Sequence, residues 1–344
     1  FRRGQHVNPR GIPCSTLAVF FLVATGCGGP HVSGDVDIFL PEVDAAPAPT
    51  RSSFLAGDSA WTEHVFGVEH GPRCADDSDY KVYSRRANDR APGFRGEAAL
   101  LLAGGGACWN ALTCAVGAAS LSADPPPRSG LPVDHALLGS RDVVYAPSCD
   151  GSLFIGNRDV FYAAPGLGFT RHRGWKNAAA AVAQLRRMNA DPLRVLVVGA
   201  SAGGVGALVV VQMVLAAFPG ADVVLVSDSG PGFHGDNRLQ LREMKDAWWM
   251  GRAVPADCTR CDPDLLPLVD LLLSRHPRLR AVGLMSSAQD RVIRNFLMMS
   301  GPRFETRLRD RLGDLHARHP DRVFRYIVPG DAHVLLNLPY QDEL

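Results

Sequence analysis

A glycine-rich turn between two apolar segments constrains the fold of this 344-residue chain more than any other feature. The apolar run at 193–198 leads into Gly199-Ala-Ser201-Ala-Gly203, and a second apolar run follows at 205–218. A strand, a Gly-x-Ser-x-Gly turn and a helix in this order are typical of a nucleophile elbow, in which small neighbours leave the serine hydroxyl exposed. We therefore expect Ser201 to be a nucleophile. The alternative is a glycine-rich turn that binds an anion at the start of the helix.

Strand-like and helix-like segments alternate along the rest of the chain. Short apolar runs predict strands, and longer amphipathic, Ala-rich or Leu-rich segments predict helices. The strands are expected at 81–86, 98–102, 143–145, 193–198, 222–226, 280–285 and 323–328, and the helices at 177–188, 205–218, 237–250, 264–276, 291–299 and 303–319. This alternation predicts an α/β fold with a mostly parallel sheet and helices on both faces.

The N-terminal residues have the pattern of an export signal. Three arginines precede an apolar run at 17–24, which is too short to span a membrane. Gly26 and Cys27 follow this run and resemble a bacterial lipobox, so we expect a signal peptide over 1–27 and acylation of Cys27. The alternative is an ordinary secretory signal. Either signal predicts an exported protein, and a lipoprotein would contact the cell envelope membrane through its lipid anchor alone.

Composition divides the remainder into a tether and one domain. Residues 28–58 are rich in Gly, Pro, Ala and Asp, which predicts a disordered tether. Residues 59–344 contain no linker-like break and are expected to form a single domain. The formal net charge is +1, and no basic stretch is interleaved with aromatic residues, which argues against a nucleic-acid partner.

The cysteines are interpreted in the light of export. Besides Cys14 and Cys27 the chain has six, an even number that predicts disulfides in an oxidising compartment. Cys108 and Cys114 flank a turn and are a plausible pair, while the connectivity of the others stays open. The six candidates are Cys74, Cys108, Cys114, Cys149, Cys258 and Cys261. The Cys-x-x-Cys at 258–261 has the spacing of half a zinc site, but no second pair completes it, so we expect no metal.

A nucleophilic serine needs a histidine as base and a carboxylate that orients the histidine. Asp290 and His333 each follow a predicted strand by a short loop, so both are expected at the edge of the sheet where Ser201 lies. Asp228 also ends a strand after the elbow and is an alternative acid. Asp331 is a weaker candidate because it is so close to His333 in sequence.

The reaction also needs hydrogen-bond donors for the negative charge that develops on the carbonyl oxygen. One is expected to be the backbone amide of Ala202, directly after the nucleophile. The other is expected from Gly104-Gly105-Gly106, which follow the predicted strand at 98–102. The alternative role of these glycines is a flexible turn. Trp109 lies beside them, as a wall of the substrate pocket or as a core aromatic.

Four segments, in the same order along the chain, resemble the pectin acetylesterase family. They are Gly104-Gly-Gly-Ala-Cys-Trp-Asn-Ala-Leu-Thr-Cys114, Tyr145-Ala-Pro-Ser-Cys149-Asp-Gly, Gly199-Ala-Ser-Ala-Gly-Gly204 and Asp228-Ser-Gly230. The family includes plant enzymes, bacterial relatives and the animal Notum branch. The resemblance implies an α/β-hydrolase-like fold and a serine esterase without a metal or cofactor. It favours Asp290 over Asp228 as the acid.

The resemblance also implies where the substrate is bound. It places the oxyanion amides around Gly105, Gly106 and Ala202. Asp228 then becomes a structural residue near the pocket, and Asp150 and Phe233 are further pocket candidates. Departures from the plant pattern, such as alanine at 107, adjoin the pocket and therefore concern the substrate rather than the hydrolytic residues.

These observations predict an exported serine carboxylic-ester hydrolase that removes O-acetyl groups from a polysaccharide or a small ester. The expected partner is therefore an ester substrate, such as an acetylated polysaccharide. One alternative is a long-acyl or lipid esterase of the Notum type. Another, from a different class, is a catalytically silent surface binding protein.

Overall fold

The computed structural model describes residues 39–88, 96–117, 119–123, 136–261 and 264–337, all of which lie in one unit, Gly34–Leu344. The predicted signal peptide, Cys27 and the first part of the predicted tether lie outside these residues. Of the helices in the described part, none is long and apolar enough to cross a bilayer.

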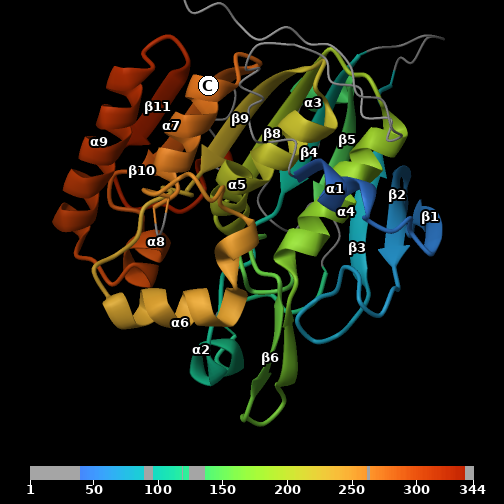
Figure 1. The fold of residues 1–344 in the computed structure, drawn as a ribbon, viewed down its shortest axis with the longest axis horizontal. Helices are drawn as coiled ribbons and strands as arrows, with labels where there is room; N and C mark the ends of the chain where they lie inside the picture. Colours follow the sequence, from blue (N-terminus) through green and yellow to red (C-terminus); the bar gives the residue numbers. More distant parts are fainter. Residues whose placement is uncertain (1–38, 89–95, 118, 124–135, 262–263, 338–344) are drawn as a thin grey trace, which may run out of the picture. The chain divides into compact units, whose positions relative to one another are not determined.

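A nine-stranded sheet organises the described chain (Figure 1). Its strands, in spatial order, are β1 (Arg51–Leu55), β2 (Asp58–Phe66), β3 (Tyr80–Arg85), β5 (Arg141–Ala146), β4 (Glu97–Leu102), β8 (Arg194–Ala200), β9 (Asp222–Asp228), β10 (Leu279–Ser287) and β11 (Val323–Val328). The strands from β5 to β11 in this order pair in parallel, and β1 to β3 extend the sheet with antiparallel pairs. The predicted mostly parallel sheet is confirmed.

Helices lie on both faces of this sheet, as predicted, but unequally. The helices are α1 (Leu40–Asp44), α2 (Ala111–Ala115), α3 (Ala136–Gly139), α4 (Gly174–Met188), α5 (Ala202–Ala217), α6 (Arg238–Trp248), α7 (Leu266–Arg275), α8 (Arg291–Phe296) and α9 (Gly301–Arg318), with 3-10 turns at Met250–Arg252 and Leu335–Asn337. Side chains of α4, α5, α7 and α9 share the main core with β4, β8, β9 and β10. A smaller apolar cluster on the other face includes Trp61, Tyr83 and Leu138 of α3.

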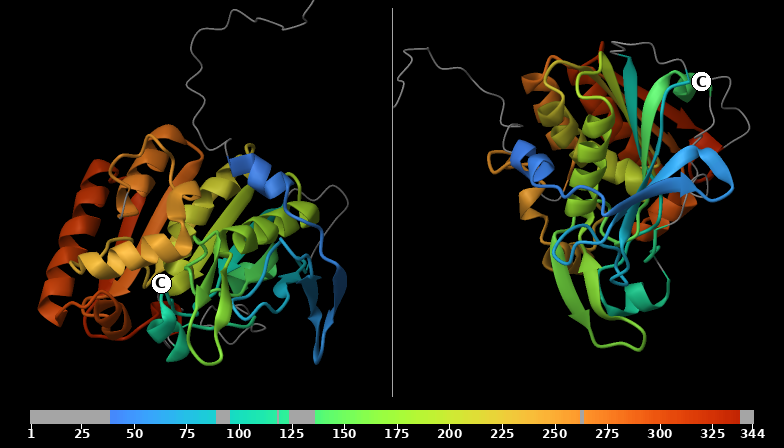
Figure 2. Two further views of the ribbon diagram at one scale, coloured as in Figure 1. Left: turned by 60° about the horizontal axis from the view of Figure 1, so that its bottom comes forward. Right: turned by 90° about the vertical axis from the view of Figure 1, so that its right-hand side faces the viewer.

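A two-stranded hairpin stands apart from the main sheet. It consists of β6 (Arg158–Tyr162) and β7 (Gly168–His172), which pair in antiparallel fashion. Figures 1 and 2 show it projecting at the end of the molecule where α2 and α6 also lie. Because Tyr162 packs in a small cluster with Cys108 and Cys114, the hairpin is fixed to the segment that carries α2.

The predicted tether over 28–58 extends too far. Helix α1 and strand β1 both form inside it, and β1 pairs with β2. Phe39 and Val43 are buried, and the ring of Phe39 packs edge-on against Trp175 at 5.5 Å between centroids. A few apolar side chains among Pro and Ala are therefore enough to hold this stretch on the domain.

The six candidate cysteines form three disulfides. Cys108 is bonded to Cys114, the pair that the sequence favoured. The other two bonds join Cys74 to Cys149 and Cys258 to Cys261. The disulfide across residues 74 and 149 links two loops that are distant in sequence and thereby holds the start of β3 near the end of β5.

Candidate active site

Ser201 lies at the turn between β8 and α5, with a backbone conformation that L-residues rarely adopt. Its φ is 55° and its ψ is −117°, and such a conformation costs about 1–3 kcal/mol. The turn has no room for larger neighbours. A Cβ on Gly199 would lie 1.9 Å from the carbonyl oxygen of Gly203, and a Cβ on Gly203 would lie 1.9 Å from that of Leu102. The glycines of the motif are thus required by the packing of the turn.

The imidazole of His333 joins the hydroxyl of Ser201 to the carboxylate of Asp290. His333 Nε2 lies 2.9 Å from Ser201 Oγ, and Nδ1 lies 2.9 Å and 3.0 Å from the two carboxylate oxygens. Because a carboxylate can only accept hydrogen bonds, Nδ1 carries the proton of the neutral ring and Nε2 has the free lone pair. The three groups are therefore connected in the order of a Ser-His-Asp triad.

The loop after β10 and the first turn of α8 hold Asp290 in place. Asp290 is fully buried, and its Oδ1 accepts hydrogen bonds from the backbone N–H groups of Val292 and Ile293, each at 3.0 Å. The N–H of Arg291 donates to the carbonyl of Asp331 at 3.0 Å, which ties this loop to the one that carries His333. The side chain of Asp331, an alternative acid in the sequence, is exposed.

Asp228, the other alternative acid, binds the segment that follows His333. Its Oδ2 accepts from the N–H of Leu336 at 2.7 Å, and its Oδ1 accepts from the hydroxyl of Ser229 at 3.1 Å. That hydroxyl oxygen in turn accepts from the N–H of Val334 at 3.0 Å. Burial raises the pKa of Asp228 above the usual range. Asp228 thus anchors the histidine loop, whereas Asp290 contacts the histidine itself.

Two of the three predicted oxyanion residues border the same cavity as Ser201. Gly106 and Ala202 line it, and Gly106 has a φ of 71° that favours glycine. Gly105 is packed so closely on the neighbouring loop that a Cβ would lie 2.7 Å from the carbonyl oxygen of Ser148. The glycine run therefore lets the backbone approach both the cavity and the loop after β5.

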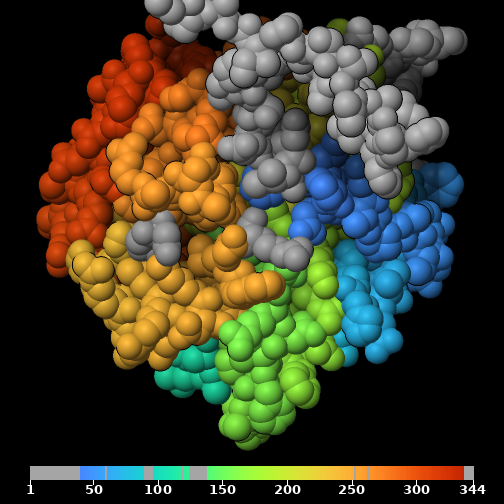
Figure 3. All heavy atoms as spheres, viewed as in Figure 1, coloured from blue at the N-terminus to red at the C-terminus, as the bar shows by residue number. Residues whose placement is uncertain are grey.

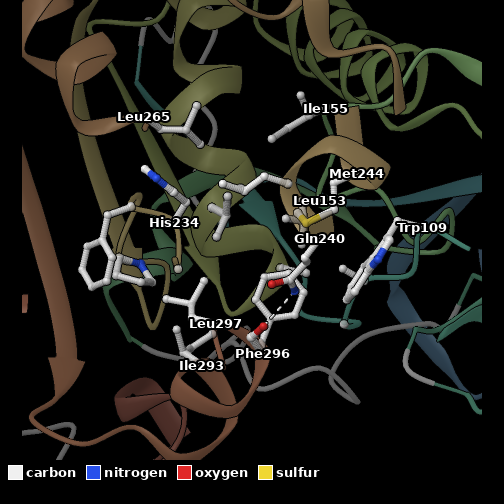
Figure 4. Close-up of a pocket in the computed structure, with 18 of the residues that line it drawn as sticks. Trp109, Leu153, Ile155, His234, Gln240, Met244, Leu265, Ile293, Phe296 and Leu297 are labelled. Carbon is white, nitrogen blue, oxygen red and sulfur yellow. Dashed lines mark hydrogen bonds between the residues drawn. The ribbon is translucent and has the colours of Figure 1, made fainter. Parts of the chain in front are cut away.

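A cavity of about 420 Å³ opens beside Ser201. Apart from the turn and α2, its walls come from α6, from the loop after β9 and from α8 with the residues that follow it. In Figure 4, Trp109 and Met244 lie on the opposite side of the pocket from His234. The apolar lining includes Trp109, Leu153, Ile155, Val205, Phe233, Leu241, Met244, Trp248, Leu265, Ile293, Phe296 and Leu297. The pocket is suited to an apolar group of considerable size.

Trp109 and Phe233, both pocket candidates from the sequence, line this cavity. Trp109 also has the role of a buried core aromatic, because its ring meets that of Phe296 edge-on at 5.6 Å. Its indole N–H donates to Glu243 at 3.1 Å. Phe233 packs against Phe304 of α9 with 5.8 Å between ring centroids.

Asp150 differs from the sequence-based expectation, because its side chain is buried and is not among the residues that line the cavity. Its carboxylate accepts a short hydrogen bond from the hydroxyl of Ser152, and burial raises the pKa of Asp150 to about 6. Its carbonyl accepts from Nδ1 of His172 at 2.7 Å, and burial lowers the pKa of His172 to about 4. The other ring nitrogen of His172 accepts from the hydroxyl of Tyr162 at 3.0 Å. This polar cluster joins the loop after β5 to the hairpin.

Sequence reasoning missed the polar residues by which α6 is fastened over the pocket. Gln240 donates through Nε2 to the carbonyl of Phe296 at 2.8 Å. Glu243 accepts from the indole N–H of Trp109 and, at 2.9 Å, from the amide of Asn110. The amphipathic pattern of α6 was visible in the sequence, but nothing there indicated which distant segment would meet its polar side chains.

The described residues contain one group of side chains with the spacing of a metal site, namely Cys108, Cys114 and His172. Because the two sulfurs are bonded to each other, neither is available as the thiolate that a metal would require. Likewise, Cys258 and Cys261, weighed as half a zinc site, form a disulfide.

Comparison with known proteins shows a sequence similarity in one segment of the chain and a similarity of fold over most of its length. The family model described as pectinacetylesterase matches residues 140–249, from β5 to the end of α6. Two crystal forms of the Wnt deacylase Notum from Drosophila share the fold, both with a TM-score of 0.54. One is 16% identical and covers 85% of this chain and 87% of that chain, and the other is 18% identical and covers 86% and 87%. No curated protein sequence matches the chain.

The family match agrees with three of the four motifs in the sequence. The family match contains the elbow and the two segments on either side of it, at 145–151 and 228–230. The structural matches extend the likeness of fold to most of the chain. The resemblance to the pectinacetylesterase family is therefore confirmed, with an α/β-hydrolase-like fold of the kind found in Notum.

Proposed function

We propose that this protein is a serine carboxylesterase in which Ser201, His333 and Asp290 form the catalytic triad. The observation that carries the proposal is the hydrogen-bonded chain from Ser201 Oγ through both ring nitrogens of His333 to Asp290. Three independent loops supply these groups, and a merely structural histidine would not need a partner on a strained nucleophile elbow.

The geometry supports a two-step reaction. His333 Nε2 takes the hydroxyl proton as Ser201 Oγ attacks the ester carbonyl, and the buried carboxylate of Asp290 stabilises the imidazolium that forms. The backbone amides of Gly106 and Ala202 are the proposed donors to the oxyanion, and each such donor is worth about 3–4 kcal/mol of barrier. His333 then gives the proton to the leaving alcohol. Water, activated in the same way, hydrolyses the acyl group from Ser201.

The pocket favours an acyl group longer than acetyl. Its volume of about 420 Å³ and its apolar walls exceed what an acetyl group can fill. Notum, which shares the fold, is a Wnt deacylase. Removal of acetyl groups, including those of a polysaccharide, is the second candidate, because the matching family model is that of pectinacetylesterase.

Three disulfides support export of the protein to an oxidising compartment. Acylation of Cys27, which would make the protein a lipoprotein rather than a freely secreted enzyme, stays a prediction.

The test compares chromogenic esters with acyl chains from acetyl to dodecanoyl on the wild-type protein and on Ser201→Ala. Each methylene that enters the pocket contributes up to about 0.8 kcal/mol, so we expect kcat/KM to rise by up to about fourfold per methylene until the pocket is full. Ser201→Ala should lose turnover and labelling by a fluorophosphonate probe.

Turnover retained by Ser201→Ala would refute the mechanism. A preference for the acetyl ester would refute the long-acyl substrate and favour an acetylesterase. A folded wild-type protein that neither hydrolyses esters nor reacts with the probe would refute the esterase and favour a binding protein without catalytic activity.

A further inference from the structure

Exposed apolar side chains gather on the β6–β7 hairpin and on the neighbouring helix α2. Phe161 and Phe169 are 61% and 58% exposed although they face each other across the hairpin. On α2, Leu112 and Val116 are 71% and 68% exposed. These exposed apolar side chains belong to elements at the same end of the molecule (Figure 1), and a large exposed apolar area marks a site of interaction with a protein or a membrane.

The tip of the hairpin is unusual in its lack of charge. From 160 to 170 the sequence is Val-Phe-Tyr-Ala-Ala-Pro-Gly-Leu-Gly-Phe-Thr, without a Lys, Arg, His, Asp or Glu. Charged residues are confined to the base of the hairpin, where Arg171 pairs with Asp159, the residue directly before this stretch, and with Asp77. In Figure 3 the hairpin protrudes from the lower end of the molecule. An uncharged, protruding segment with its charged residues confined to the base can enter the apolar part of a lipid layer without carrying a charge into it.

The hairpin and α2 form one body with the pocket. Tyr162 of the hairpin packs in one apolar cluster with the disulfide of Cys108 and Cys114, which encloses α2. The N–H of Asn157 donates to the carbonyl of Trp248, a residue of the pocket wall, at 2.8 Å. A surface that took up the hairpin would therefore meet the molecule at the end where α2 and α6 lie (Figure 2), and both of these helices contribute to the lining of the pocket.

We propose that the hairpin and α2 dock the protein onto a lipid–water interface, from which the pocket takes an ester of a long acyl chain. The proposal deepens the proposed function and rests on it for the ester, but the docking surface itself is independent of catalysis. Interfacial segments of proteins bury Phe and Leu among the acyl chains and keep basic residues at the headgroups. Arg238 and Arg242, exposed on α6 at the same end, add positive charge that suits anionic headgroups.

The observations favour a lipid over a polysaccharide. A sugar ring is recognised through hydroxyl groups and therefore needs polar side chains beside the aromatic rings. The polar side chains between 160 and 170 are those of Tyr162 and Thr170, and both are buried. The rings of Phe161 and Phe169 meet at an interplanar angle of 67°, so they present edges rather than one flat platform.

The experiment measures binding to vesicles. The chain from residue 28 onward, which lacks both the apolar run at 17–24 and Cys27, is sedimented with vesicles of phosphatidylcholine alone or mixed with phosphatidylglycerol. We expect binding that is stronger with phosphatidylglycerol. The double variant Phe161→Ser/Phe169→Ser should bind about tenfold more weakly for each ring removed, whereas Phe324→Ser, equally exposed at 56% on β11, should bind like the parent protein.

Activity separates docking from catalysis. Both variants should hydrolyse a soluble short-chain ester at the parental rate, whereas the hairpin variant should lose turnover of an ester carried in vesicles. Ser201→Ala should bind vesicles as the parent does, so a protein that binds vesicles without hydrolysing any ester would refute the esterase and leave the docking surface standing. Vesicle binding unaffected by the hairpin variant, or sedimentation with polysaccharide in place of vesicles, would overturn the docking proposal.

Discussion

Replacing Asp290 by asparagine tests the proposed triad with little disturbance of the fold. In the wild-type structure Oδ1 of Asp290 accepts from the N–H groups of Val292 and Ile293, and Oδ2 accepts from His333 Nδ1 at 2.9 Å. An asparagine keeps the two backbone bonds only if its oxygen takes the place of Oδ1. Its NH₂ group then faces His333, and two donors would meet.

His333 can relieve this conflict by moving its proton to Nε2. The ring nitrogen next to Ser201 then has no lone pair with which to accept the hydroxyl proton, so the base is lost although every heavy atom stays in place. The same change in serine proteases lowers kcat about 10⁴-fold, which corresponds to about 5.4 kcal/mol of barrier. Because asparagine caps a helix about as well as aspartate, we expect the free energy of unfolding to change by less than about 1 kcal/mol.

The assay is kcat/KM for a chromogenic octanoyl ester, together with a urea unfolding curve for each variant. Asp331→Asn is the matched control, because it makes the same chemical change on an exposed side chain of the histidine loop. Its rate should equal that of the wild type. A folded Asp290→Asn protein with kcat/KM within tenfold of the wild type would refute the assignment of Asp290 as the group that orients His333.

Two further predictions concern the elbow and the buried polar cluster around Asp150. Gly203→Ala should lower the free energy of unfolding by about 3 kcal/mol or more, because its Cβ would lie 1.9 Å from a carbonyl oxygen of β4. The control is Gly251→Ala, which has open space around it and should change the urea unfolding curve little. Equal effects of the two substitutions would contradict the packing argument. Burial raises the pKa of Asp150 from 3.8 to about 6, so the folded state holds this proton more tightly than the unfolded state. The stabilisation is present below about pH 4 and is lost as the pH rises through about 6, so the wild type should lose about 3 kcal/mol relative to Asp150→Asn over this window. The prediction is checked by urea unfolding curves of both proteins from pH 4 to 7. An equal dependence of the free energy of unfolding on pH in the two proteins would refute it.

The sequence predicted the parallel core of the fold well, because its elements have strong local signals. The strand expected at 323–328 is observed with the same ends, and the helix expected at 303–319 is α9 (Gly301–Arg318). The hairpin at β6 and β7 was missed. Its strands are only five residues long and mostly exposed or half-buried, and Tyr162 packs against a disulfide that lies outside the hairpin, so the local sequence gives a weak strand signal.

The contacts among site residues were harder to predict than the residues themselves. Sequence order alone left Asp290 and Asp228 as competing acids, since both follow strands that end at the same edge of the sheet. The distinction lies in a few ångströms of loop geometry: Asp228 meets backbone N–H groups beyond His333, whereas Asp290 meets the ring. The link between Glu243 and Trp109 depends on how α6 crosses the pocket, which no local pattern encodes.

The positive φ of Ser201 means that the most reactive position of the chain is also one where the backbone would prefer a different residue. Glycine adopts that conformation without a clash, so a chain optimised for thermal resistance alone would drift toward it and become inert. Screens for more thermostable variants of this protein should therefore measure turnover in every round. Without that measurement they will enrich variants that stay folded on heating and have lost catalytic activity.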